Sequence, residues 1–170
     1  MTRVILITGG QRSGKSLYAE QCALSLSEHP IYVATARIFD EDFRERVAIH
    51  QARRGKQWIN IEEDKDLAQH DFSHQVVLVD CLTLWATNFF FDLNESVPDA
   101  LEALRMQLEA LYRQTEVTYI FVTNELGLGG VSAHAVQRKF ADLQGSLNQM
   151  VASEADEVTM MISGIPMRIK

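Results

Sequence analysis

The chain has 170 residues, of which 46% are hydrophobic and 23% charged, as in an ordinary soluble globular protein. Its net charge of −7 comes with no basic tail or stripe, which argues against a general DNA- or RNA-binding protein. No apolar run approaches the roughly 20 residues that span a bilayer, and the N-terminus lacks the pattern of a signal peptide. We therefore expect one domain over residues 1–170, located in the cytoplasm.

Short apolar runs alternate with longer amphipathic stretches along the chain. The apolar runs predict strands at residues 4–8, 31–34, 76–79, 119–123 and 158–162. A last strand at 167–169 would pair with its predecessor through the turn at 164–166. The amphipathic stretches predict helices at residues 15–28, 41–54, 83–92, 98–114 and 135–152. This alternation predicts an α/β fold, with a mainly parallel sheet, helices on both faces and a C-terminal hairpin.

The motif GGQRSGKS at residues 9–16 lies between the first strand and the first helix, and it matches G-x-x-x-x-G-K-[ST] in full. The backbone N–H groups of such a loop bind phosphate together with the helix N-terminus. Lys15 is predicted to contact the β- and γ-phosphates, and the Ser16 hydroxyl to bind Mg²⁺. Arg12 lies inside the loop, where it either contacts phosphate or remains solvated.

Asp80 ends the apolar run VVLVD, at the sheet edge where open α/β proteins bind their ligands. A carboxylate in this position can hold Mg²⁺ through water, as a Walker-B aspartate does. The alternative is an aspartate that caps the following helix near Thr83. The neighbouring Cys81 is interpreted as a small buried residue. It forms no CxxC pair with Cys22, which favours a reduced protein.

The predicted helix at residues 41–54 places His50 on one face with Arg46, Arg53 and Arg54. Cations on one face repel each other, and a bound anion would relieve that repulsion. A neutral imidazole can attack phosphorus, and neighbouring arginines can bind the phosphate. From the spacing alone, the plainer interpretation is a solvated basic face with an incidental histidine. His70 and His74 have the H-x-x-x-H spacing, but they lie in predicted loops or at element ends and the chain has no H-E-x-x-H motif, so we propose no zinc site.

Together these segments resemble the bifunctional adenosylcobinamide kinase / adenosylcobinamide-phosphate guanylyltransferase family. The resemblance runs in order through GGQRSGKS, YVATA at 32–36, RVAIHQARR at 46–54, DCLTLWATN at 80–88, VTNELGLG at 122–129 and the C-terminal SGIPMRIK. It covers essentially the whole chain. The VTNE-x-G-x-G and R-x-x-x-H patterns are much narrower signals than a phosphate loop alone.

The resemblance implies a RecA-like P-loop NTPase fold, a homotrimer with sites between subunits, and two activities. One activity phosphorylates adenosylcobinamide with GTP or ATP. The other transfers GMP from GTP to adenosylcobinamide phosphate, giving adenosylcobinamide-GDP and pyrophosphate, with His50 as the covalent GMP carrier. Lys15 and Mg²⁺ would neutralise the pyrophosphate. The implied nucleotide contacts are Gly9, Gly10, Gln11, Arg12, Ser13, Gly14, Lys15, Ser16, Ala34, Thr35, Ala36, Gln51, Ala52, Arg53, Arg54, Glu62 and Asp80.

Three functional alternatives stay open at this point. A P-loop kinase of another small molecule would not need His50. A GTP-binding regulatory module would bind nucleotide without turnover, and a chain of this family could retain only one of the two activities. The apolar stretch FFF at 89–91 marks either a subunit interface or a helix end buried in its own core. The segment at 129–134 replaces the family's G-I-V-P and could form a mobile loop near the acceptor.

Overall fold

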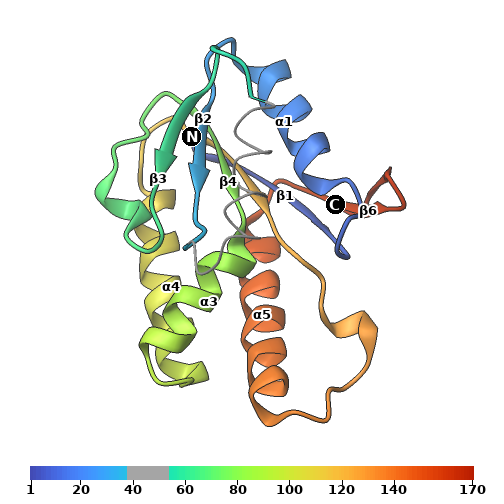
Figure 1. Cartoon of the computed structure of the whole chain (residues 1–170). Helices are drawn as coiled ribbons and strands as arrows, with labels where there is room; N and C mark the ends of the chain where they lie inside the picture. Colours follow the sequence, from blue (N-terminus) through green and yellow to red (C-terminus); the bar gives the residue numbers. More distant parts are fainter. Residues whose placement is uncertain (38–53) are drawn as a thin grey trace.

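The computed structural model describes residues 1–37 and 54–170 (Figure 1). These residues form a seven-stranded sheet in the order β3-β2-β4-β5-β1-β6-β7, in which only β6 and β7 pair antiparallel. The strands are β1 (Arg3–Gly9), β2 (Ile31–Ala34), β3 (Ile59–Glu62), β4 (Val76–Asp80), β5 (Thr118–Val122), β6 (Glu157–Ile162) and β7 (Ile165–Arg168).

Helices cover both faces of this sheet. They are α1 (Lys15–Leu26), α3 (Leu82–Asp92), α4 (Val97–Tyr112) and α5 (Ala135–Glu154), with 3₁₀ turns η1 (Leu67–Gln69) and η2 (Gly127–Gly129). Alternate residues of β1 show the two layers, because successive side chains of a strand point to opposite faces. Val4 and Leu6 join the core under α3, α4 and α5, whereas Ile5 and Ile7 join the core under α1.

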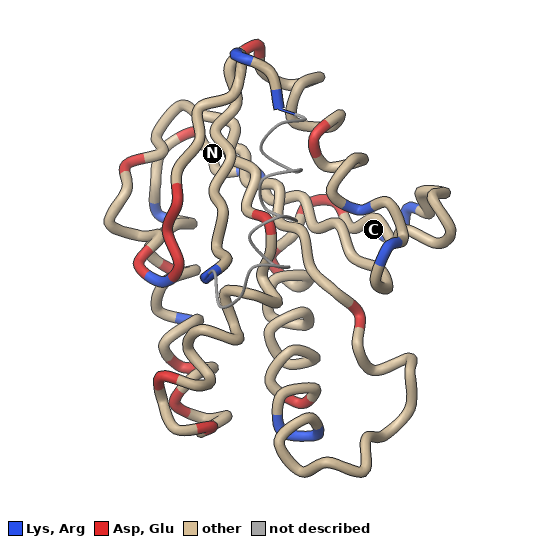
Figure 2. The backbone as a smooth tube through the Cα atoms, viewed as in Figure 1, with Lys and Arg blue, Asp and Glu red and all other residues tan. Residues whose placement is uncertain are grey.

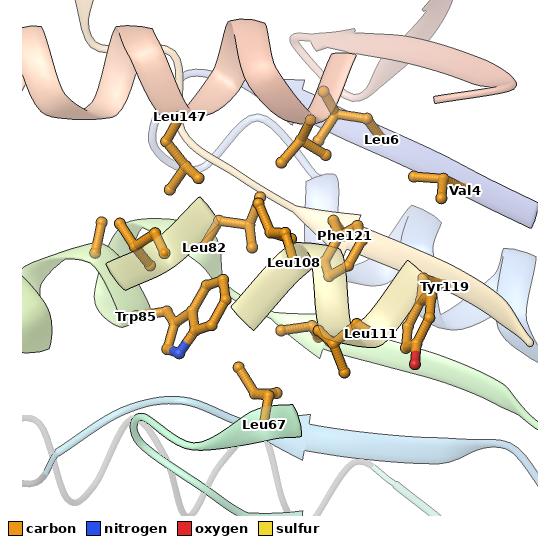
Figure 3. Close-up of a cluster of buried hydrophobic side chains, with 14 of the residues drawn as sticks. Val4, Leu6, Leu67, Leu82, Trp85, Leu108, Leu111, Tyr119, Phe121 and Leu147 are labelled. Carbon is orange, nitrogen blue, oxygen red and sulfur yellow. The ribbon is translucent and has the colours of Figure 1, made fainter. Parts of the chain in front are cut away.

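The larger core lies between the sheet and α3, α4 and α5. Trp85, Leu108, Leu111, Tyr119 and Phe121 fill it from the helices and from β5 (Figure 3). The Trp85 indole is fully buried, and its N–H donates to the backbone carbonyl of Lys65 at 2.9 Å, so burying it leaves no polar group unpaired. No helix among residues 1–37 and 54–170 is long and apolar enough to cross a membrane.

The sheet order confirms the predicted fold class. One strand, β5, separates β1, which leads into the phosphate loop, from β4, which ends at Asp80. That is the RecA-like arrangement of P-loop NTPases. The C-terminal hairpin is also confirmed, although β7 begins at Ile165 instead of residue 167. Pro166 fits within β7 because the strand lies at the edge of the sheet, where a missing N–H removes no ladder bond.

The predictions missed β3 and left one helix untested. β3 is four residues long and three of them are exposed, so the stretch offers no apolar run to recognise. The predicted helix at 41–54 lies outside the described residues apart from Arg54. The FFF stretch at 89–91 was predicted to be either a subunit interface or a helix end buried in its own core, and its three residues differ in exposure. Phe89 and Phe90 are buried in the core of α3, α4 and α5, whereas the ring of Phe91 faces outward.

These neighbouring phenylalanines provide a matched test of the packing. Phe90 is 0% exposed and contacts the ring of Phe140 edge-on, whereas Phe91 is 56% exposed. We expect Phe90→Ala to lower the free energy of unfolding by about 3–5 kcal/mol. Phe91→Ala should lower it by about 0.5 kcal/mol or less. Urea denaturation measures both. Equal losses from the two variants would contradict the exposed position of Phe91.

Candidate nucleotide-binding site

The parallel register brings the polar ends of several strands to one edge of the sheet. Ala34 of β2 lies beside Glu62 of β3 on one side and beside Asp80 of β4 on the other. Asp80 lies beside Val122, and Val122 beside Ile7, two residues before Gly9. The phosphate loop, Glu62, Ala34 and Asp80 therefore share the edge where parallel α/β sheets bind ligands.

The backbone of the phosphate loop is held from two sides. Gly9, Arg12 and Gly14 have positive φ angles of 149°, 56° and 94°, a run of left-handed backbone of the kind that forms anion-binding loops. A Cβ atom at Gly9 would lie 2.5 Å from the carbonyl oxygen of Met161, so only glycine fits there. The Gly9 carbonyl accepts a hydrogen bond from the Glu125 N–H at 3.0 Å.

The C-terminal hairpin supplies the second support of the loop. Its turn residue Gly164 donates its N–H to the carbonyl of Ser13 at 3.0 Å. The same turn lies close to Gly14, because a Cβ atom there would sit 3.4 Å from the Gly164 Cα. The last hairpin of the chain thus fixes the shape of a loop that begins at residue 9.

Lys15 folds back over the loop in this structure. Its side chain is buried, and its Nζ donates to the Gly10 carbonyl and lies 3.4 Å from the Ser13 hydroxyl. Burial lowers the pKa of Lys15, and the negative charge of Asp80 partly opposes that shift. A phosphate in the loop would give this ammonium group a charged partner in place of a backbone carbonyl.

Asp80 is oriented by a tyrosine and does not cap a helix. The N-cap of α3 is Cys81, whereas one carboxylate oxygen of Asp80 accepts a hydrogen bond from the Tyr32 hydroxyl at 2.9 Å. Burial, together with the neighbouring Asp80 charge, raises the pKa of Tyr32 well above its usual range. The hydroxyl therefore stays a donor, and among the described residues the second oxygen of Asp80 accepts no hydrogen bond.

The oxygen atoms of Ser16 and Asp80 are suitable Mg²⁺ ligands, since this ion prefers hydroxyl, carboxylate and phosphate oxygens. Within residues 1–37 and 54–170, no group of three or more histidine, cysteine, aspartate or glutamate side chains could form a metal site by itself. A Mg²⁺ ion here would therefore depend on the phosphates of its nucleotide, which is the usual way that proteins hold it.

Arg54 lies on the ring of Tyr32. Its guanidinium carbon is 3.4 Å from the ring centroid, and its Nε donates to the Asn60 side chain at 3.0 Å. The Nη1 atom of Arg54 is buried and has no hydrogen-bond partner among residues 1–37 and 54–170. Such an unpaired buried donor is costly, so this position favours an anionic ligand. Trp58 contacts the same tyrosine edge-on, with 5.9 Å between ring centroids.

Residues 5–169 match the family model described as cobinamide kinase / cobinamide phosphate guanyltransferase. The chain belongs to this family. The bifunctional adenosylcobalamin biosynthesis protein CobP of Pseudomonas aeruginosa is 37% identical over 97% of this chain and 96% of that protein. CobU of Escherichia coli is 33% identical over 98% of this chain and 99% of that protein. Among solved structures, the flagellar accessory protein FlaH of Methanocaldococcus jannaschii aligns over 96% of this chain and 74% of that chain, with 12% identity and a TM-score of 0.44.

The protein is therefore a kinase and nucleotidyltransferase of the cobinamide kinase / guanyltransferase family. Its structure brings the phosphate loop, residues 34–36, Glu62, Asp80 and Arg54 to one region of the sheet edge. The carrier histidine implied by the resemblance, His50, lies outside the described residues, as do Gln51, Ala52 and Arg53. Arg12 is exposed in the loop and forms no hydrogen bond to another described residue.

Hydrogen bonds between Thr35 and Cys81 join the residues that follow β2 and β4 at this edge of the sheet. The Thr35 hydroxyl donates to the Cys81 carbonyl at 2.8 Å and accepts from the Cys81 N–H at 3.0 Å. The Asn88 side chain donates to the Thr35 carbonyl at 2.8 Å. These polar atoms of Thr35 are thus bonded within the protein, where they hold Ala34 and Asp80 in place. Cys81 is buried, as predicted, and burial, reinforced by Asp80, raises the pKa of its thiol to about 12.

The VTNE segment, which the sequence analysis used as a family signal, is bonded to side chains of α3 and α5 whose contacts could not be read from the sequence. The Thr123 hydroxyl donates to the Asn148 side chain at 2.6 Å, and Asn148 donates to the Asn124 carbonyl at 3.0 Å. Asn124 in turn donates to the Thr83 hydroxyl of α3. Gln144 joins the same network from one turn earlier on α5. The spacing of Gln144 and Asn148 on one helical face was the available signal.

The hydroxyl of Tyr32 should matter for Mg²⁺ and nucleotide binding. In Tyr32→Phe the ring still supports Arg54, but the Asp80 carboxylate loses the only hydrogen bond that it accepts from a described residue. We expect the Mg²⁺ concentration that gives half-maximal GTP binding to rise roughly fivefold, equivalent to about 1 kcal/mol. Isothermal titration of GTP at several Mg²⁺ concentrations measures this shift.

Tyr119→Phe is the matched control for that experiment. Tyr119 is also buried, and its hydroxyl lies 3.1 Å from the Gln114 side chain, away from the sheet edge. Because each variant loses one hydrogen bond from a buried tyrosine hydroxyl, the free energy of unfolding should fall by similar amounts in both. A Mg²⁺ shift that is the same in both variants, or absent from Tyr32→Phe, would show that Tyr32 does not orient Asp80 for the metal.

Proposed function

We propose that the chain phosphorylates adenosylcobinamide with GTP or ATP, and that it also transfers GMP from GTP to adenosylcobinamide phosphate through a guanylyl-His50 intermediate. The products of the second reaction are adenosylcobinamide-GDP and pyrophosphate. Family membership supports the two activities. One structural observation supports the covalent step. Arg54, four residues after His50, lies on Tyr32, which donates to Asp80. Arg54, the last residue of the R-x-x-x-H segment at 46–54, therefore lies at the sheet edge that carries Asp80 and the phosphate loop, which we call the nucleotide edge.

The guanylyl transfer is a double displacement. An imidazole nitrogen of His50 attacks the α-phosphorus of GTP, a P–N bond forms, and the bond from the α-phosphorus to the bridging oxygen breaks as pyrophosphate leaves. A phosphate oxygen of the acceptor then attacks the same phosphorus. A P–O bond forms, the P–N bond breaks, and the imidazole is regenerated. Ping-pong kinetics follow from this sequence of steps.

The described residues have separate roles in that reaction. Lys15 and the backbone N–H groups of the phosphate loop bind the β- and γ-phosphates and neutralise the departing pyrophosphate. Ser16 and Asp80 would hold Mg²⁺, which when bound reduces the negative charge on these phosphates. Arg54 binds the α-phosphate region with its unpaired Nη1.

Glu62 would select the base. Its carboxylate can accept hydrogen bonds from N1–H and the exocyclic amino group of guanine, a pair that adenine does not offer. An enzyme site built to pair such groups strongly rejects a ligand that lacks them. Glu62 lies beside Ala34 at the end of its strand, on the edge that carries the phosphate loop. A preference for GTP in the guanylyl transfer follows.

We also propose that the protein is a homotrimer and that it is located in the cytoplasm. The β6–β7 hairpin offers one feature that fits a subunit contact, because it carries exposed apolar side chains at the sheet edge: Ile162, Ile165, Met167 and Ile169. An edge strand with unpaired backbone groups is a natural surface for association.

The covalent step is tested by GTP labelled at the α-phosphate or at the γ-phosphate. The protein is incubated with Mg²⁺ and each label without acceptor, denatured, and its bound label counted. We expect only the α-label to be retained, in a bond that acid breaks and alkali does not. His50→Ala should retain none. The control His74→Ala changes an exposed histidine that pairs with Glu116, and it should retain label like the wild type.

Other outcomes have distinct meanings. Retention of neither label would reject the covalent mechanism and indicate either a P-loop kinase without a covalent intermediate or a GTP-binding module. Retention of the γ-label would indicate a phosphoprotein instead of a guanylyl-protein. Retention of the α-label in His50→Ala would place the carrier at another residue.

A further inference from the structure

A groove of about 750 Å³ lies between the loop around η2 and the N-terminal half of α5. In Figure 1 this loop is the orange segment that leaves β5 and passes alongside α5. The groove is lined mainly by apolar side chains, including Phe91, Leu126, Val131, Val136 and Phe140. Val131 is 88% exposed and Phe91 is 56% exposed. A concave apolar surface of this size is typical of a ligand site.

The groove is continuous with the nucleotide edge through two elements. Glu125 donates its N–H to Gly9 of the phosphate loop, and the next residue, Leu126, already lines the groove. On the opposite side, Thr83 bonds to Asn124 at the first turn of α3, and Thr87 lines the groove one turn later. A ligand in the groove would therefore lie beside the phosphate loop.

Hydrogen bonds hold the outer wall of the groove against α5. One guanidinium nitrogen of Arg138 donates to the carbonyls of Ser132 and Ala133 at 2.9 and 2.8 Å. The Ser132 hydroxyl donates to the Gln137 side chain and accepts the N–H of His134. The wall is thus a formed surface with a cation, an amide and backbone groups at its rim.

We infer that this groove binds the corrinoid acceptor of the reaction proposed above, and the inference rests on that proposed function. A corrinoid is a rigid macrocycle with methyl groups and amide side chains around its edge. The apolar lining suits the macrocycle and its methyl groups, while the polar rim suits the amides. Arg138 can pair with an acceptor that carries a phosphate, while Asp142 in the same lining can accept hydrogen bonds from the amides. An acceptor held here can direct its reactive hydroxyl or phosphate toward the phosphate loop.

The test compares two changes to aspartate in the same loop. Val131→Asp places a charge in the groove. Leu128→Asp places one on a side chain that is 76% exposed and does not line the groove. The coloured ligand cobinamide is used as the probe in equilibrium dialysis with purified protein. We expect its Kd to rise about tenfold or more in Val131→Asp, because the carboxylate would be desolvated against the macrocycle. Leu128→Asp should bind like the wild type, as should the conservative Val131→Leu.

Three results would overturn the inference. One is cobinamide binding that Val131→Asp leaves intact, and another is binding that both aspartate variants weaken equally. The third is a lower oligomeric state of Val131→Asp alone in light scattering, which would make the groove a contact with a second copy of the chain. Protein-bound GMP formed by the wild type from GTP alone tests the proposed function separately. Its absence would reject the covalent mechanism, while dialysis would still decide where cobinamide binds.

Discussion

The parallel pairing of neighbouring strands is the constraint on which the rest of the site depends. Because β3, β2, β4, β5 and β1 run in the same direction and in register, the residues that follow them meet at one edge. Glu62, Asp80 and the phosphate loop come from distant parts of the chain, and no local interaction would bring them together. In Figure 2 the charged residues of the described backbone are spread over many elements, and strand register brings Glu62 and Asp80 to the same edge.

The phosphate loop is rigid for reasons that lie outside its own motif. Gly9 leaves no room for a side chain beside Met161 of β6, and Gly164 of the last hairpin binds the loop at Ser13. Glu125 binds it from the end of β5. If the loop binds phosphate as proposed, a backbone fixed in this way loses little further conformational freedom on binding. The C-terminal hairpin is therefore part of the structure that shapes the phosphate loop.

The features that could be predicted are those formed by residues close together in the sequence. The phosphate loop is a contiguous motif, and Asp80 ends a recognisable apolar strand. The sequence alone therefore predicts that both lie at the ligand-binding edge of the sheet. The partner of Asp80 could not be predicted, because Tyr32 is 48 residues away and meets it only through the β2–β4 register. β3 was missed because most of its side chains are exposed. Phe90 and Phe91 look identical in sequence and differ only in the face of α3 on which they lie.

We propose that this sheet edge binds GTP and that GMP passes to the protein before any acceptor binds. Exchange of labelled pyrophosphate into GTP tests it most directly, because the exchange requires the covalent intermediate to form and revert. The measurement uses GTP, Mg²⁺ and labelled pyrophosphate without any corrinoid. We predict that label enters GTP with the wild type and that Lys15→Ala greatly slows its entry. Exchange that occurs only when adenosylcobinamide phosphate is added would contradict the claim and indicate direct transfer to the acceptor.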